Sequence, residues 1–133
     1  LLCAKLSSRV IPVMHKMVQM GYSHVPVFEN GLLYGVFSIS TVFSKVLDSN
    51  EDPVTKDTLI RDFADYLPIG EHVCETFLFA ARDTTLIEAE AMFDSQKGPE
   101  QNKVAAIFIT HNGTCRERIL GMLTPWDVLD ANN

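Results

Sequence analysis

Two polar residues, Thr124 and Asp127, stand three positions apart where one apolar run of the sequence ends and another begins, within the stretch GMLTPWDVL at residues 121–129. A hydroxyl and a carboxylate at this spacing can start a helix as a capping box, each satisfying a backbone N–H group near the other. The same groups can also hold a ligand, because a helix N-terminus offers free N–H donors that favour an anion. The two uses are compatible, and the sequence leaves both open.

Catalytic motifs are missing from the rest of the sequence. It contains no Gly-x-Ser-x-Gly, no His-Glu-x-x-His, no phosphate-binding P-loop and no Cys/His pairing. Asp57, Asp62 and Asp65 cluster, but carboxylates at helical spacing are typical of a solvated face. No pair among the four histidines has the spacing of metal ligands. We therefore predict a protein that is not an enzyme and that has no metal site.

The elements that must position Thr124 and Asp127 occur twice in the chain. Three pairs of segments match: residues 11–18 with 86–93, Val25 and Val27 with Ile107 and Ile109, and Gly35–Ser38 with Gly121–Thr124. The offset grows from 75 to 82 and then to 86, around the polar stretches SQKGPEQNK and TCRER. Loop-forming stretches accept insertions at little cost, so the pattern indicates two copies of one unit.

Each copy predicts a helix, a strand, an Asn-Gly turn, a strand and a second helix. The second copy also has a strand candidate, ETFLFAA, before its first helix, and a capping box formed by Thr85 and Glu88. In the first copy only the short LLCAKL could supply that strand. We predict a first repeat at residues 1–50 with an incomplete N-terminal strand, a connecting segment with a short helix at residues 51–72, and a second repeat at residues 73–133.

These two copies resemble a tandem pair of CBS domains, the Bateman module. The most specific piece is Gly121-x-x-Thr124-x-x-Asp127, and GYSHVPV at residues 21–27 is a second family-like piece. The resemblance implies an α/β (α+β) fold of two pseudo-twofold related β-α-β-β-α repeats packed through their sheets. It also implies a regulatory module that binds an adenosine-containing ligand, such as AMP, ADP or ATP, in the cleft between the repeats, with no required cofactor.

The resemblance assigns the main contacts to Thr124 and Asp127, whose counterparts bind phosphate and ribose in the family. The first repeat keeps a hydroxyl at Ser38, but Thr41 stands where the family has Asp, so this half-site should be weaker or empty. The further residues expected beside the ligand are Phe79, Ala80, Ala81, Ala106, His24 and Pro26. A histidine satisfied at a strand start, and alanines that only permit close packing, are the alternatives. Arg82, Arg116 and Arg118 could meet the phosphates.

Composition narrows the class of partner. Hydrophobic residues make up 47% of the chain, as in a globular core, and the net charge of −6 without a Lys or Arg run disfavours nucleic acid and anionic membranes. Three separated cysteines favour a reduced, cytoplasmic setting. The chain begins at Leu1, and we interpret it as a fragment. The alternative function is a structural homodimerisation module without a ligand, in which Trp126 would pack against another subunit.

Overall fold

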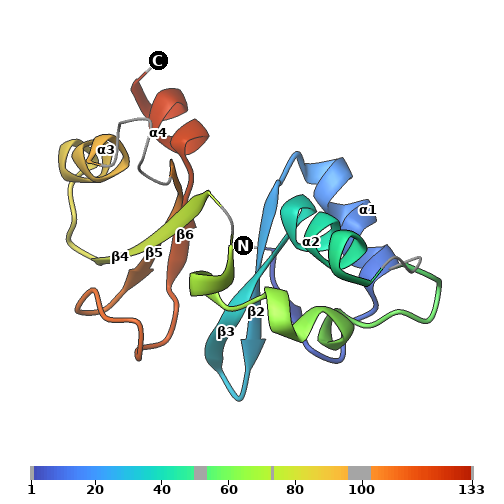
Figure 1. Cartoon of the computed structure of the whole chain (residues 1–133). Coiled ribbons are helices and arrows are strands. Elements are labelled where there is room, and N and C mark those ends of the chain that lie inside the picture. Colours follow the sequence, from blue (N-terminus) through green and yellow to red (C-terminus); the bar gives the residue numbers. More distant parts are fainter. Residues whose placement is uncertain (1, 50–53, 73, 96–102, 133) are drawn as a thin grey trace. The chain divides into compact units, whose positions relative to one another are not determined.

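The computed structural model describes residues 2–49, 54–72, 74–95 and 103–132, which fall into two compact units, residues 2–72 and 74–132 (Figure 1). The predicted boundaries near residues 51–53 and 73, and most of the predicted insertion SQKGPEQNK, lie outside the described residues. The predicted mixture of helices and strands is confirmed, and the strands form two separate three-stranded sheets.

The first unit has the order β1 (Ala4–Lys5), α1 (Val10–Met20), β2 (His24–Glu29), β3 (Leu32–Ser38) and α2 (Ile39–Ser49). Strand β1 pairs parallel with β2, and β2 pairs antiparallel with β3. Asn30 and Gly31 turn the hairpin with φ of 53° and 79°, the left-handed backbone for which Asn-Gly is favoured. Helices α1 and α2 lie together on one side of this sheet (Figure 1).

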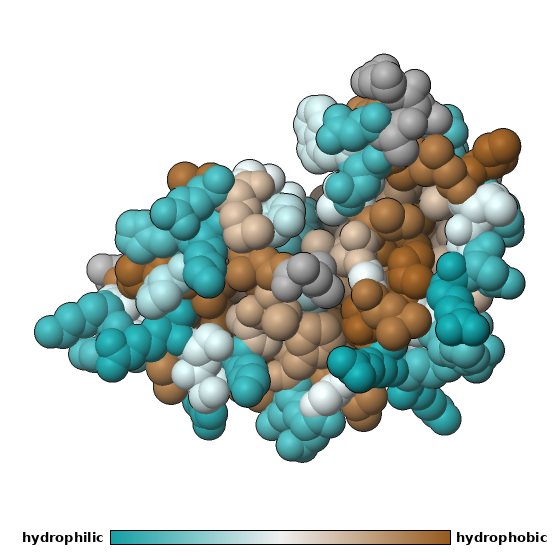
Figure 2. Space-filling model, turned by 180° about the vertical axis from the view of Figure 1, so that it is seen from behind, coloured by the Kyte–Doolittle hydropathy of each residue, from teal (hydrophilic) through white to brown (hydrophobic). Residues whose placement is uncertain are grey.

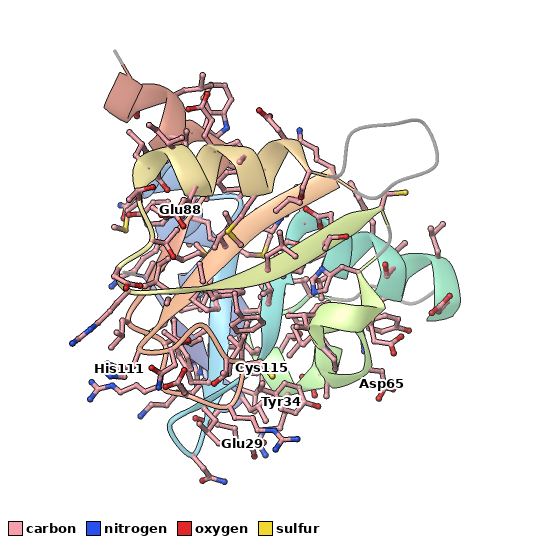
Figure 3. The ribbon with its side chains drawn as sticks, turned by 90° about the vertical axis from the view of Figure 1, so that its left-hand side faces the viewer. Glu29, Tyr34, Asp65, Glu88, His111 and Cys115 are labelled. Carbon is pink, nitrogen blue, oxygen red and sulfur yellow. The ribbon has the colours of Figure 1, made fainter. Side chains whose placement is uncertain are left out.

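The connecting segment folds onto the first unit. It forms two 3₁₀ helices, η1 (Ile60–Tyr66) and η2 (Ile69–Glu71), where the sequence predicts one short helix. Ile60, Phe63 and Leu67 are fully buried in the core of the first unit. The Phe63 ring meets Phe37 edge-to-face, with 5.5 Å between centroids. The hydroxyl of Tyr34, labelled in Figure 3, donates to the Ala64 carbonyl at 3.3 Å. The segment therefore contributes to the first unit's core.

The second unit repeats the order: β4 (Glu75–Ala81), α3 (Leu86–Asp94), β5 (Lys103–Thr110), β6 (Gly121–Leu123) and α4 (Pro125–Asn132). Strands β4 and β5 pair parallel, and β5 and β6 pair antiparallel. The predicted capping box is confirmed: Thr85 Oγ1 accepts from the Glu88 N–H at 3.2 Å, and Glu88 Oε1 accepts from the Thr85 N–H at 3.3 Å. Figure 3 shows Glu88 at the first turn of α3.

The strand registers match the repeat alignment derived from the sequence. Val27 lies opposite Gly35 in the first sheet, and their counterparts Ile109 and Gly121 lie opposite each other in the second. The connection between the paired strands is what differs. Two residues join β2 to β3, whereas residues 111–120 join β5 to β6. The longer connection lengthens the loop and leaves the pairing unchanged, so the same positions of each unit lie where the last helix begins.

Candidate functional site

Thr124 and Asp127 form the helix start that their spacing predicts. Asp127 Oδ2 accepts hydrogen bonds from the Thr124 backbone N–H at 2.8 Å and from the Thr124 hydroxyl at 3.1 Å. The Thr124 carbonyl accepts from the Asp127 N–H at 3.1 Å, the first turn of α4. The Asp127 side chain is exposed, and its Oδ1 receives no hydrogen bond from the described residues. The cap thus holds the carboxylate in place while one oxygen faces solvent.

In the first unit, the equivalent helix start is capped by a hydroxyl group and not by a carboxylate. Thr41 Oγ1 accepts from the Ser38 backbone N–H at 3.1 Å, as Asp127 Oδ2 does from Thr124. The Thr41 hydroxyl donates to the Val36 carbonyl at 3.5 Å, and both Thr41 and Ser38 are buried. The Ser38 hydroxyl bonds the Ser40 hydroxyl at 2.8 Å. Local bonds therefore occupy Thr41, and this helix start presents no carboxylate.

The sheet register brings some of the predicted site residues together. His24 lies directly opposite Ser38, and Pro26 lies two positions further along β2, opposite Val36. With Thr41 in the first turn of α2, these residues lie around one end of the β2–β3 pair. Ala106 occupies the matching place in the second unit, because the next residue, Ile107, pairs with Leu123 just before Thr124. The bond of His24 Nδ1 with the Ser23 hydroxyl at 2.8 Å satisfies that ring nitrogen locally.

The register separates the other predicted residues from Thr124. Phe77 lies opposite Ala106, whereas Ala81 lies opposite Thr110, four residues further along the strands. Four residues of strand span roughly 13 Å, so Ala81 lies towards the far end of the sheet, with Phe79 and Ala80 between. Phe79 instead packs its ring on Phe108, with 5.6 Å between centroids. The residues of the second unit that the sequence predicts beside the ligand are therefore spread along the strands and do not gather at one end of the sheet.

The three arginines proposed for phosphates lie at that far end. Arg82 directly follows β4, and Arg116 and Arg118 lie in the loop that leads to Gly121, the residue opposite Ile109. Lys103, at the start of β5, is on the strand that leads to Ala106 and is exposed. The sequence reasoning did not consider Lys103, which lies three residues before Ala106 on the same strand. Within the second unit, Arg82, Arg116 and Arg118 are remote from Thr124 along the strands.

Glu117 organises the β5–β6 loop, and the sequence reasoning missed it. Its Oε1 accepts from the backbone N–H groups of Asn112 and Thr114 at 2.9 and 3.2 Å and from the Thr114 hydroxyl at 2.9 Å. Its Oε2 accepts from the Asn112 side-chain amide at 3.0 Å. Figure 3 shows His111 and Cys115 in this loop. The signal was present in the Thr-x-x-Glu spacing of residues 114–117, which matches a capping box.

The pKa of Glu117 gives a pH-dependent prediction. Partial burial raises this pKa, but the hydrogen bonds from Asn112, Thr114 and Thr110 lower it more, to about 2 from an ordinary 4.5. A carboxylate with a depressed pKa stabilises the fold fully above its unfolded pKa and loses this contribution as the pH falls towards the folded value. We expect urea unfolding of Glu117→Gln to show a stability deficit that is largest above pH 5 and shrinks between pH 5 and pH 3. A deficit that is constant over this range would contradict the assignment.

Among the described residues, no group of three or more His, Cys, Asp or Glu side chains is placed to hold a metal ion. In the same part of the chain, no helix is long and apolar enough to cross a membrane.

Comparison with known proteins shows which fold this geometry has. The CBS domain model matches residues 3–48, from β1 to near the end of α2. A comparison with curated proteins finds no match. One similar solved structure is the CBS-domain containing protein ATU1752 from Agrobacterium tumefaciens. The match covers 100% of this chain and 90% of the ATU1752 chain, with a TM-score of 0.64 and 10% identity. The chain has the fold of a tandem CBS domain pair.

Other solved structures resemble this chain along its whole length. Protein MJ1225 from Methanocaldococcus jannaschii, proposed to be an archaeal homologue of g-AMPK, covers 100% of the chain and 44% of its own, with a TM-score of 0.63 and 20% identity. CBSX2, solved in complex with AMP, covers 99% of the chain and 87% of its own, with a TM-score of 0.59 and 18% identity. At these identities the likeness establishes the fold.

Proposed function

We propose that this chain is a non-catalytic regulatory module that binds an adenosine-containing ligand, such as AMP, ADP or ATP. Thr124 and Asp127 make the main contacts, and the ligand shifts the population of two arrangements of the module. Because three exposed, unpaired cysteines suit a reducing compartment, we also propose a cytoplasmic setting.

The observation that carries the proposal is the exposed, pre-positioned carboxylate of Asp127. Its Oδ2 is held by the Thr124 N–H and hydroxyl, and its Oδ1 faces solvent. A ribose presents two adjacent hydroxyl donors, and a charged acceptor strengthens each such bond. The N–H groups of Thr124 and Asp127 are already bonded and Pro125 has none, so the Trp126 N–H and the helix dipole are what favour a nearby phosphate at the start of α4. Helix capping alone requires only one oxygen of this residue, so the geometry leaves acceptor capacity for a ligand.

Two of the similar structures support this choice of ligand class. CBSX2 was solved with AMP, and MJ1225 is related by its description to g-AMPK. The first repeat supports a single strong site per chain, because Thr41 replaces the carboxylate and is occupied by Ser38 and Val36. We therefore place His24, Pro26 and Ser38 in a weaker half-site, and Ala106 beside the strong one.

The proposal is tested by replacing Asp127 with its uncharged isostere. We expect Asp127→Asn to weaken binding of the ligand about tenfold to a hundredfold, since a hydrogen bond to a charged group contributes about 1.5–3 kcal/mol. Asparagine still accepts a hydrogen bond at a helix start, so the fold is retained. Mass spectrometry of molecules released from the purified protein identifies the ligand, and titration calorimetry measures its affinity.

Asp130→Asn is the matched control, because it removes the same charge from an exposed position of α4, one turn further on. If Asp127→Asn and Asp130→Asn weakened binding equally, the loss would be a long-range effect of charge. That result would contradict the proposed contact between Asp127 and the ribose. Two equally tight sites per chain would contradict the assignment of the first repeat.

A second candidate function is homodimerisation, with or without a ligand. It is favoured by large apolar side chains that remain exposed on the helices of both units, including Phe43 and Leu47 on α2 and Trp126 and Leu129 on α4. Exposed apolar patches on a folded protein mark interaction surfaces. Thermal unfolding separates the two candidates, because a ligand that binds only the native state raises the midpoint. A concentration-dependent midpoint that no nucleotide shifts would favour dimerisation alone.

A further inference from the structure

Three residues of helix α2 share one of its faces. Thr41, Lys45 and Asp48 follow the spacing i, i+4 and i+7, which brings side chains to the same side of a helix. Thr41 lies in the first turn, where its hydroxyl belongs to the weaker half-site of the first repeat. Lys45 and Asp48 lie in the later turns and contact the connecting segment that leads to the second unit. One face of α2 therefore reaches from the half-site to that segment.

Polar contacts join this face of α2 to the 3₁₀ helix η1. The Lys45 ammonium donates to the Asp62 carbonyl oxygen at 2.8 Å and lies 5.4 Å from the centroid of the Phe63 ring. The Tyr66 hydroxyl donates to Asp48 Oδ2 at 2.9 Å. This hydrogen bond raises the pKa of Tyr66 above its ordinary 10, so the hydroxyl stays protonated at neutral pH. We call the contacts of Lys45 with η1, together with the bond between Tyr66 and Asp48, the latch.

The hydroxyl groups of the first half-site are closed on one another and on the backbone. Ser38 Oγ lies 2.8 Å from Ser40 Oγ, and Thr41 Oγ1 accepts from the Ser38 N–H at 3.1 Å. The Thr41 hydroxyl also donates to the Val36 carbonyl at 3.5 Å. Ser38 and Thr41 are each only 2% exposed. A ligand can therefore bond these two hydroxyls only if the first turn of α2 shifts and uncovers them.

The latch resists this shift. Packed helices move by small rigid-body displacements, so a shift of the first turn of α2 also displaces Lys45 and Asp48. Helix η1 cannot follow them, because its Ile60 and Phe63 side chains are fully buried in the core of the first unit. The half-site therefore opens only if the latch contacts break.

The latch lies where water can replace its hydrogen bonds. Asp48 is exposed, and Lys45 and Tyr66 are half-buried. Across the face of the molecule shown in Figure 2, hydrophilic residues likewise make up much of the surface, with hydrophobic residues between them. A polar contact that water can replace contributes little to stability, so the latch can open while the first unit remains folded.

We propose that the latch regulates the first half-site. While the latch is closed, Ser38 and Thr41 stay covered; an adenine nucleotide that bonds them opens the latch and detaches α2 from η1. This rests on the function proposed above and adds regulation of its weaker half-site. Coupling between two equilibria is reciprocal, so a nucleotide that favours the open latch binds more tightly once the latch is broken.

The test breaks the latch by mutation and measures AMP binding to the first half-site. Lys45→Met with Tyr66→Phe, the latch variant, removes both hydrogen bonds and keeps side chains of similar size. Both changes are made in the whole chain carrying Asp127→Asn, so that the strong site contributes less to the calorimetric signal. Lys16→Met with Tyr22→Phe in the same chain is the matched control, because it removes the same groups from exposed positions on α1 and between α1 and β2.

We expect the latch variant to bind AMP about fivefold more tightly than the control, or more, in titration calorimetry. Loss of the Lys45 charge alone would weaken the binding of an anion, so the expected change has the opposite sign from a simple charge effect. Hydrogen exchange at residues 43–48 of α2 should be faster in the latch variant than in the control. Saturating AMP should speed the same exchange in the Asp127→Asn chain whose latch is intact.

Tyr66→Phe alone removes a single hydroxyl and should give a smaller gain in AMP affinity of the same sign. Equal AMP affinities of the latch variant and the control, or exchange at residues 43–48 that AMP slows, would overturn the latch and leave the nucleotide site at Asp127 standing. A wild-type chain that binds no AMP, ADP or ATP would overturn both the regulatory role of the latch and the proposed function.

Discussion

Gly35→Ala is expected to destabilise the first unit by about 3 kcal/mol or more. A methyl group at this position would overlap the backbone carbonyl of Leu67, where the connecting segment crosses β3. The overlap cannot be relieved by a side-chain rotation, since the backbone fixes the position of the Cβ atom and the atoms it would meet belong to the main chain of Leu67 and Pro68. The neighbouring Val36 N–H donates to the same Leu67 carbonyl at 2.8 Å, so any retreat of the segment breaks this hydrogen bond.

Gly121 is the matched control for Gly35, because the two glycines occupy equivalent positions of the two repeats. It occupies the same place in the second hairpin, opposite Ile109 as Gly35 is opposite Val27, yet no described atom lies within 4 Å of an added methyl group. Gly121→Ala should therefore change stability by no more than about 1 kcal/mol. Urea unfolding of both variants measures the difference. Similar midpoints for the two variants would contradict the close approach at Leu67.

Phe63→Ala is expected to cost about 3–5 kcal/mol, although the residue lies in the segment that connects the repeats. Its side chain is fully buried, packs edge-to-face on Phe37, and lies under the Lys45 ammonium, with 5.4 Å from Nζ to the ring centroid. Truncation leaves a cavity in the core of the first unit and removes the aromatic contact as well. Truncation of a residue in a solvent-exposed linker would change the free energy of unfolding very little.

Asp65→Ala on the same 3₁₀ helix is the comparison, because Asp65 is exposed there and most surface changes stay within about 0.5 kcal/mol. Native-state hydrogen exchange extends the measurement. Loss of Phe63 should speed exchange throughout the first sheet, since the core that protects it is weakened. Protection that is lost only within residues 59–67 would mean that the segment unfolds independently of the first unit.

Part of the candidate site could be predicted because its residues are close together in the sequence. A Thr-x-x-Asp spacing suffices for a helix start, so the contact between Thr124 and Asp127 follows from three residues of chain. The absence of the carboxylate from the first repeat could also be predicted, because Thr41 stands at the position that matches Asp127. The separation of Ala81 from Ala106 could not be predicted, because it depends on which residues of β4 and β5 lie opposite each other, and register is a property of the assembled sheet.

Local patterns in the sequence account for the repeat, for the order of its elements and for the tight turn of the first hairpin. These follow from apolar periodicity and from the left-handed backbone that Asn30 and Gly31 tolerate, both of which act over a few residues. Three features emerge only from the fold: the connecting segment belongs to the first core, the backbone of Leu67 requires glycine at position 35, and a pocket opens between α1 and α2. Each of these depends on packing between residues distant in the chain, where shape and close approach, rather than spacing, select the contact.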